Sequence, residues 1–161
     1  MTARTSYPTT LTMPSERELL ITRTFAAPRR LVFEALTRRE HIAHWYGPRS
    51  YTLRSCEIDL RVGGTWRYVL ADADGHEFAF SGEYREIAPP ERIVTTEGFE
   101  GMPGREYLVT LTLDEHDGRT ELRTHLVYQS AADRDGHLQS GMEPGMRETY
   151  ERMAELLATL A

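Results

Sequence analysis

The sequence predicts one α+β domain, in which a curved antiparallel sheet of seven strands wraps around a single long helix at the end of the chain. Six runs between residues 51 and 128 alternate apolar and polar residues, which is typical of strands. Residues 140–161 place apolar side chains every three or four positions, as one face of a helix does. With 161 residues, 40% of them hydrophobic, the chain is long enough for one core and too short for two domains.

Residues 1–16 are expected to form a flexible arm, and residues 17–161 the folded domain. The beginning of the chain holds Thr, Ser and Pro with few apolar residues, and it lacks the continuous apolar run of a signal peptide. The first strand is predicted at about 18–25, where apolar residues alternate with more polar neighbours.

Two short helices are predicted after this strand. Pro28 is well placed to open the first one, because its fixed φ suits the first helical turn. Thr37 can cap the second, which reaches Trp45 and is ended by Gly47 and Pro48. Both helices therefore lie between the first strand and the other six in the sequence.

The remaining strands are predicted at 51–59, 65–71, 77–87, 92–98, 107–114 and 120–128. Short turns such as Asp74-Gly75 and Asp117-Gly118 join consecutive strands, which favours an antiparallel meander. A sheet of this size followed by one amphipathic helix buries both apolar surfaces most economically when the sheet curls round the helix.

The C-terminal helix has one apolar and one charged face. Its apolar positions are Met142, Met146, Tyr150, Met153, Leu156, Leu157 and Leu160. On the charged face Glu148 precedes Arg152 by four residues, the favourable order for a helical ion pair. Ser140 and Glu143 have capping-box spacing, but Pro144 also suits the first position, so the start stays open by a few residues.

Composition excludes several classes of function. The net charge is −6 and no arginine cluster exceeds a pair, which argues against a nucleic-acid partner. All 19 basic residues are Arg, so neither Schiff-base chemistry nor a phosphate-loop lysine is available, and no dinucleotide-binding or serine-nucleophile motif occurs. No apolar run is long enough to span a membrane. We therefore expect no cofactor.

Three further groups were weighed as sites of chemistry. Cys56 is the single cysteine; it is expected to be a buried thiol in a reducing cytoplasm rather than a nucleophile. His41 and His44 are close enough to share a metal, but no third ligand is evident, so we expect a helix surface and no metal. Asp72 and Asp74 resemble the start of a calcium loop whose remaining ligands are missing, so a hairpin turn explains them better.

Six short motifs follow one another in order: Ala27-Pro28, Val32-Phe33-Glu34-Ala35-Leu36, Trp45-Tyr46-Gly47-Pro48, Asp59-Leu60-Arg61-Val62-Gly63-Gly64, Gly82-Glu83-Tyr84 and Pro90-Glu91-Arg92-Ile93. Together with the order of elements, they resemble the START-like (SRPBCC, helix-grip) superfamily, in the branch named for the C-terminal domain of the activator of heat-shock protein 90 ATPase. The resemblance covers residues 19–160. It implies a helix-grip fold with a cavity between the long helix and the concave sheet, which in related families takes lipids, hormones or aromatic polyketides.

Strand and helix periodicity then gives the residues expected to line such a cavity. They are Trp45, Trp66, Tyr68, Phe80, Tyr84, Phe99, Val109, Leu111, Met142, Met146, Tyr150 and Met153. Plain core packing is the alternative for each of them. Phe99 and Met102 lie in a Gly-rich segment that is either a mobile lid or a long hairpin loop.

Four polar residues are further candidates for a functional role. Glu83, Glu97 and Arg49 are candidate polar anchors of a ligand, but the alternation along the strands leaves open whether their side chains point into the cavity. His125 falls on the polar face of its strand, where a solvent-side histidine is favoured over a catalytic base.

Three functions stay open. The favoured one is a cytoplasmic module that encloses a small hydrophobic or aromatic ligand, held by apolar contact and oriented by a few polar groups. The alternatives are a cofactor-free cyclase, dehydratase or hydrolase that uses an acid or base in the pocket, and a co-chaperone of a heat-shock ATPase with a part in the stress response, as the family name implies. The oligomeric state also stays open, with a homodimer as one alternative.

Overall fold

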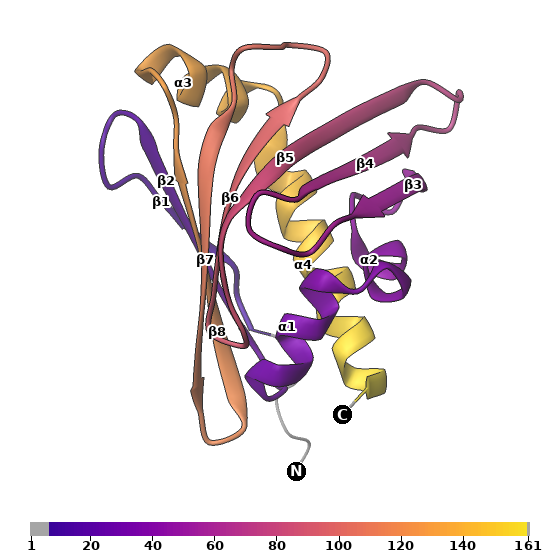
Figure 1. Ribbon diagram of the computed structural model, residues 1–161, viewed down its shortest axis with the longest axis vertical. Coiled ribbons are helices and arrows are strands. Elements are labelled where there is room, and N and C mark those ends of the chain that lie inside the picture. Colours follow the sequence, from indigo (N-terminus) through magenta and orange to yellow (C-terminus); the bar gives the residue numbers. More distant parts are fainter. Residues whose placement is uncertain (1–6, 161) are drawn as a thin grey trace.

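The computed structural model describes residues 7–160, which form one eight-stranded sheet and four helices (Figure 1). The strands are β1 (Thr10–Thr12), β2 (Glu18–Phe25), β3 (Thr52–Ile58), β4 (Thr65–Ala71), β5 (Glu77–Ala88), β6 (Arg92–Phe99), β7 (Tyr107–His116) and β8 (Arg119–Val127). The helices are α1 (Arg29–Thr37), α2 (Arg39–Trp45), α3 (Ala131–Gln139) and α4 (Met142–Leu160).

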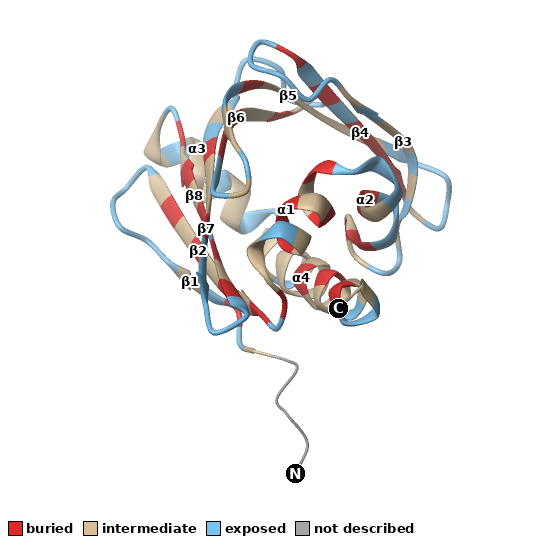
Figure 2. Cartoon of the chain, turned by 60° about the horizontal axis from the view of Figure 1, so that its bottom comes forward, coloured by how far each residue is buried: buried red, intermediate tan, exposed pale blue. Residues whose placement is uncertain are grey.

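The sheet is antiparallel throughout, with the strand order β1-β2-β8-β7-β6-β5-β4-β3. It curves into an arc, and α1, α2 and α4 lie on its concave side (Figure 2). Irregular pairing in β3 and β5, the latter between Tyr84 and Glu86, is of the kind that bends a strand and increases its twist. The α+β helix-grip architecture predicted from the sequence is therefore confirmed.

The predicted strand count of seven is wrong, because a short eighth strand precedes the others. β1 pairs antiparallel with β2, with Thr10 opposite Thr22. Just before it, Thr9 is buried and its hydroxyl accepts a hydrogen bond from Arg23 at 3.2 Å. β1 has only three residues, too few to show strand periodicity, and it falls within the segment expected to be an arm. Residues 1–6 of that arm lie outside the described part of the chain.

The helix count also differs, because α3 precedes the long helix. Ser130 caps α3 by accepting a hydrogen bond from the Asp133 backbone N–H at 3.1 Å. Gly141, with φ +86°, separates α3 from α4, since this left-handed conformation suits glycine. The long helix therefore begins at Met142, and Ser140 caps the end of α3 instead of starting α4. α3 buries no residue, so it leaves no apolar stripe in the sequence.

α4 is fixed against the sheet and against α2. It buries Tyr150, Met153 and Leu157, and the Tyr150 ring meets the edge of Phe25 on β2 with centroids 6.1 Å apart. Arg152 donates to the backbone carbonyls of Gly47 at 2.7 Å and of His44 at 3.0 Å. The arginine thus satisfies carbonyls that the end of α2 leaves unpaired. Within residues 7–160, no helix is both long enough and apolar enough to cross a bilayer.

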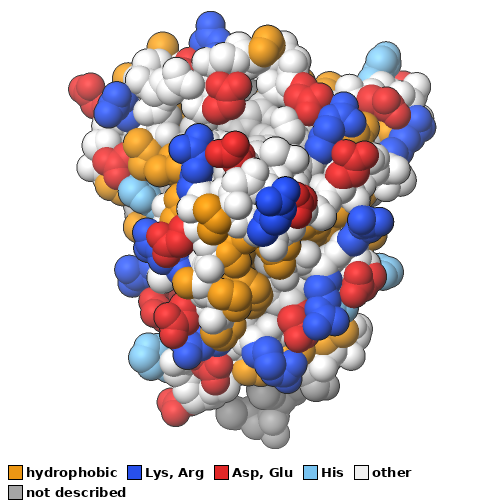
Figure 3. Space-filling view, viewed as in Figure 1, with side chains coloured by type: hydrophobic (Ala, Val, Ile, Leu, Met, Phe, Trp, Pro, Cys, Tyr) orange, Lys and Arg blue, Asp and Glu red, His pale blue; other side chains and the backbone are white. Residues whose placement is uncertain are grey.

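Charged side chains of both signs are interspersed on the face seen in Figure 3, without a large patch of one sign. Exposed ion pairs of the described residues include Arg54 with Glu77 at 3.2 Å and Arg67 with Glu100 at 2.9 Å. Such pairs contribute little to stability because water screens them. The face shown therefore carries no basic patch of the kind that binds a polyanion.

Candidate ligand-binding interior

Aromatic side chains from β4 and from the residue that follows α2 meet on the concave face of the sheet. The ring of Tyr68 lies 4.8 Å from that of Tyr46 and 4.7 Å from that of Trp66, measured between centroids. The indole N–H of Trp66 donates to the Thr95 hydroxyl at 2.8 Å, which fixes the indole on its strand. These contacts build one wall of the interior from residues that differ widely in sequence position.

Glu97 faces the same interior from β6. It alternates with Ile93 and Thr95, which are buried on the inner face, and it pairs directly across the ladder with Tyr107 of β7. The Tyr107 hydroxyl donates a hydrogen bond to the Glu97 carboxylate. Burial raises the pKa of Glu97, and the hydrogen bond from Tyr107 opposes this shift. Of the three candidate polar anchors, Glu97 is the one that points inward.

The charge of Glu97 contributes to the raised pKa of several tyrosines. Burial is the main cause of a raised pKa at each of them, and the carboxylate of Glu97 adds to the shift because it disfavours a second negative charge nearby. We refer to Glu97 and these tyrosines as the interior site, which comprises Tyr46, Tyr68, Glu97, Tyr107, Tyr128 and Tyr150.

α3 covers one end of the interior site. The ring of Tyr107 lies 4.8 Å from that of Tyr128 and 5.4 Å from that of His137 on α3, and the Tyr128 hydroxyl is 2.5 Å from His137 Nδ1. Burial lowers the pKa of His137, which favours the neutral imidazole. This helix therefore contributes a neutral hydrogen-bonding group next to Tyr107.

The predicted lining residues fall into two groups. Seven are buried, namely Trp45, Trp66, Tyr68, Tyr84, Val109, Tyr150 and Met153. Five keep part of their surface exposed, namely Phe80, Phe99, Leu111, Met142 and Met146. Trp45 donates its indole N–H to the Ala35 carbonyl at 2.8 Å and so joins α2 to α1. Contact with a ligand stays a prediction for all twelve.

Sequence reasoning placed Tyr128 on a concave strand face with Leu122 and Leu126, but it did not select Tyr46, Tyr107 or His137 as lining residues. Tyr107 carried a usable signal, because it shares its strand face with the selected Val109. His137 carried none, because α3 has no apolar periodicity.

The other two candidate anchors lie away from the interior. Arg49 pairs with Glu155 on the exposed side of α4. Glu83 pairs with Arg85 at 3.0 Å, and both of these side chains are about half exposed.

The segment considered as a lid follows β6. The Phe99 ring packs 5.3 Å from that of Phe80, whereas Met102 is 52% exposed. A Cβ on Gly101 would lie 2.5 Å from the Phe99 ring, so a larger residue at this position would displace that ring. Phe99 is thus packed on the sheet, and a lid role stays a prediction.

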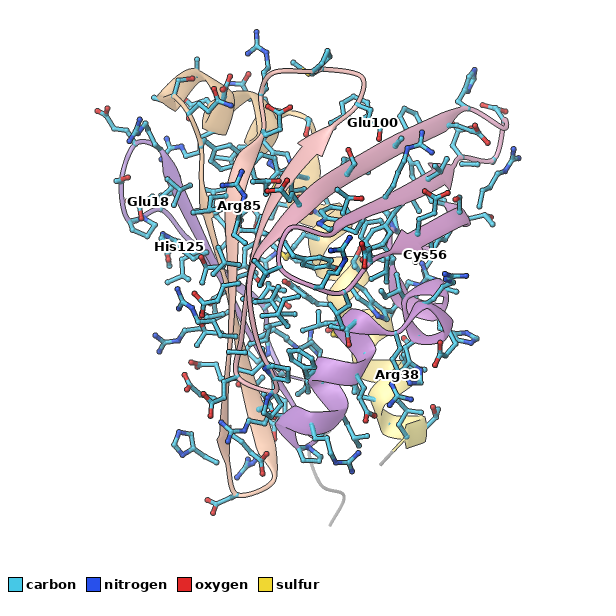
Figure 4. The ribbon with its side chains drawn as sticks, in the orientation of Figure 1. Glu18, Arg38, Cys56, Arg85, Glu100 and His125 are labelled. Carbon is cyan, nitrogen blue, oxygen red and sulfur yellow. The ribbon has the colours of Figure 1, made fainter. Side chains whose placement is uncertain are left out.

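His125 pairs with Glu18 at 2.5 Å on the outer side of β8 and β2, where Figure 4 shows both side chains.

Cys56 was expected to be buried but is half-buried, because β3 is the last strand of the sheet. Burial still raises the pKa of its thiol, which disfavours the reactive thiolate.

Asp72, Asp74 and His76 gather in the β4–β5 turn, with potential ligand atoms within 4.8 Å of one another. The Asp72 carboxylate accepts hydrogen bonds from the backbone N–H groups of Asp74 and His76, both at 2.9 Å. These bonds are those of a hairpin turn, and they account for the cluster without an ion.

A polar groove of about 470 Å³ lies near the β7–β8 turn, on the side of the sheet opposite the interior site. It is lined by Tyr7, Thr24, Asp114, His116, Asp117, Arg119, Glu121 and Arg123. Its charged groups partly satisfy one another, as Arg123 and Glu121 do at 2.7 Å. The groove shares no residue with the interior site.

Comparisons with known proteins agree with this architecture. The family model for Activator of Hsp90 ATPase homolog 1-like protein matches residues 26–158. No curated protein matches the chain. Among solved structures, a protein from Rhodobacter sphaeroides is 28% identical with a TM-score of 0.88, covering 96% of this chain and 100% of its own. Protein Ms6760 from Mycobacterium smegmatis is 25% identical with a TM-score of 0.84, covering 93% and 97%.

An AHSA1 protein from Silicibacter pomeroyi shares the fold, with 23% identity and a TM-score of 0.70 over 89% of this chain and 99% of its own. The family match spans most of the described residues and includes α1, α2, β3 to β8 and most of α4. The resemblance stated from the sequence motifs is therefore confirmed, and the chain belongs to the family of Activator of Hsp90 ATPase homolog 1-like proteins.

Proposed function

We propose that the protein binds a small apolar or amphipathic molecule between α4 and the concave face of the sheet. One observation carries the proposal: several side chains pack against the buried core yet keep exposed surface, namely Tyr46, Phe80, Tyr107, Leu111, Met142 and Met146. Covering such surface with a ligand gains roughly 25 cal/mol for each Å² of apolar area.

The chemistry of these groups suits an adaptable pocket. Met142 and Met146 lie one turn apart on α4, and flexible thioether side chains conform to irregular ligands. The tyrosines offer flat apolar faces and a hydroxyl each, while Glu97 supplies a fixed polar group. Small-molecule sites usually combine many apolar contacts with a few polar ones. Association of the superfamily with ligand binding supports the same proposal.

The test compares two substitutions on the same strand. Leu111→Trp places an indole on the inner face of β7, whereas Leu108→Trp places it on the exposed outer face. Binding of the uncharged probe N-phenyl-naphthylamine is followed by fluorescence. We expect the probe to bind the wild type and the Leu108 variant, and to bind the Leu111 variant at least ~10-fold more weakly, the loss that about 1.4 kcal/mol of apolar contact produces.

Equal binding by both variants would place the probe outside the interior and contradict the proposal. Circular dichroism and the melting temperature of each variant establish that it is folded. A protein that binds none of the lipids, aromatic compounds and polyketides in a native mass spectrometry screen would also contradict it.

A cofactor-free enzyme is the second candidate, and Glu97 is the observation that favours it. A partly buried carboxyl with a raised pKa next to a tyrosine hydroxyl is the kind of group used as a general acid. No specific observation favours a co-chaperone.

We further propose a cytoplasmic location, since a single cysteine fits a reducing compartment. A homodimer is one alternative for the oligomeric state, and analytical ultracentrifugation distinguishes it from a monomer.

A further inference from the structure

Glu97 is a carboxyl group in the interior without a cationic partner among residues 7–160. The hydrogen bond from Tyr107 is received by Oε2, and among these residues nothing donates to Oε1. The side chain nevertheless keeps some exposed surface while lying on the inner face of β6. Oε1 keeps access to solvent, because in the described chain the one buried side-chain polar atom without a hydrogen-bond partner is Arg23 Nη2. An N–H donor of a ligand can replace that solvent, and a hydrogen bond to an ionised carboxylate is stronger than one between neutral groups.

Three arginines on β2, α3 and α4 are committed to other partners. Arg23 on β2 pairs with Glu151 at 2.7 Å and donates to Thr9, and Arg152 donates to carbonyls at the end of α2. Arg134, near Tyr128, bonds to Asp135 at 2.8 Å and to the Ser15 carbonyl at 2.7 Å. The interior site therefore offers a negative or neutral acid and no free positive charge within the described residues.

The groups around Glu97 are tyrosine rings. Tyr107 and Tyr128 form one pair, with ring centroids 4.8 Å apart, and Tyr46 and Tyr68 form a second pair at the same spacing. The faces of aromatic rings carry negative electrostatic potential and attract cations, most strongly where water is excluded. A carboxylate among tyrosine rings is thus complementary to an organic cation and unfavourable for an anion.

We propose that the interior site binds an arylalkylamine, a compound that joins an aromatic ring to an alkylammonium group, with the ammonium group donating to Glu97 Oε1 and lying against the rings of the surrounding tyrosines. This inference rests on the proposed function and names the chemical class of its ligand. A neutral hydroxyl compound of the same shape makes the apolar contacts but lacks the charge. A carboxylate of that shape places like charges together.

The experiment uses three probes with the same indole ring: tryptamine, tryptophol and indoleacetate, which are cationic, neutral and anionic at neutral pH. Affinities are measured by isothermal titration calorimetry with the wild type, Glu97→Gln and Glu86→Gln. The last is a matched control, because Glu86 lies on the neighbouring strand and pairs with Arg92 at the surface. We expect the wild type and the control to bind tryptamine at least ~10-fold more tightly than tryptophol, the ratio that one charge-assisted hydrogen bond supplies.

In Glu97→Gln that ratio should fall to about one, while tryptophol affinity stays within about twofold because its apolar contacts are intact. Retained tryptophol binding also shows that the variant is folded. This inference would be overturned, and the proposed function left standing, if the wild type bound tryptophol or indoleacetate as tightly as tryptamine or more tightly. An amine preference that persists in Glu97→Gln would overturn it as well. Failure of all three probes contradicts the inference alone if N-phenyl-naphthylamine still binds, and both proposals if it does not.

Discussion

The Tyr107 hydroxyl on β7 donates a hydrogen bond to the Glu97 carboxylate, its partner directly across the ladder on β6. Because both residues lie on the inner face, the sheet holds an acid and a phenol at a fixed separation inside the fold. This arrangement gives the interior a polar group that core packing alone does not need. Its energetic cost predicts how the protein responds to pH and to substitution.

The unfolding free energy of Glu97→Gln minus that of the wild type should increase as pH rises. The folded state raises the pKa of Glu97 above its usual 4.5, so the native state binds this proton more tightly than the unfolded state does. The wild type therefore loses this stabilisation as pH rises through the folded-state pKa, and the variant has no such proton to lose. Urea denaturation of both proteins from acid to neutral pH measures the difference, and a gap that shrinks with rising pH would contradict the assignment.

His137 should respond to pH in the opposite direction. Burial lowers its pKa from 6.5, so the unfolded state takes up the proton first and stability falls as pH decreases through that value. The urea midpoint of His137→Gln should change less than that of the wild type between about pH 8 and about pH 5. His116→Gln, at the exposed end of β7, is the control and should follow the wild type.

The buried arginine on β2 predicts a strong dependence on its partner in α4. Arg23 is 1% exposed and pairs with the Glu151 carboxylate at 2.7 Å, and its Nη2 has no hydrogen-bond partner in the described chain. Glu151→Ala should therefore cost ~3 kcal/mol of unfolding free energy, since it leaves a buried charge without its counter-ion.

Glu155→Ala, on the same helix, removes an ion pair that is more than half exposed on both sides and should cost less than ~1 kcal/mol. Guanidinium chloride denaturation of the two variants compares them directly. Equal losses would show that the Arg23 pair is as well solvated as a surface pair.

Thr9 should stabilise the attachment of β1. It is buried, and its hydroxyl accepts from Arg23 at 3.2 Å while its backbone carbonyl accepts from Arg147. Thr9→Val removes the hydroxyl acceptor and should cost ~1–2 kcal/mol, whereas Thr12→Val at the exposed end of β1 should be nearly neutral. Thermal unfolding of both variants checks this, and a Thr9 effect no larger than that at Thr12 would contradict it.

The sequence predicted the elements that have a long, one-sided pattern. β4 carries apolar residues at 66, 68 and 70, β8 alternates Thr or Leu with mostly charged residues, and α4 carries apolar residues at helical spacing, so their periods identify them. β1 is too short to show the two-residue alternation of a strand. α3 has a capping signal at Ser130 but no apolar face, and a cap without a face does not establish a helix.

The interior site was less accessible to sequence reasoning, for a physical reason. In β6 the consecutive residues Ile93, Val94 and Thr95 are all buried, so alternation could not show which face Glu97 shares. His137 reaches the site because α3 folds back over Tyr128, which no local pattern predicts. The strand faces could be predicted, whereas the grouping of acid, phenol and imidazole depends on how the sheet curves.

The most direct test of the central claim is a crystal structure of the protein with N-phenyl-naphthylamine bound. The account predicts the probe between α4 and the sheet, in contact with Tyr107 on β7 and Met146 on α4. A probe bound only at the outer surface, with these two side chains closing on each other in the interior, would contradict it.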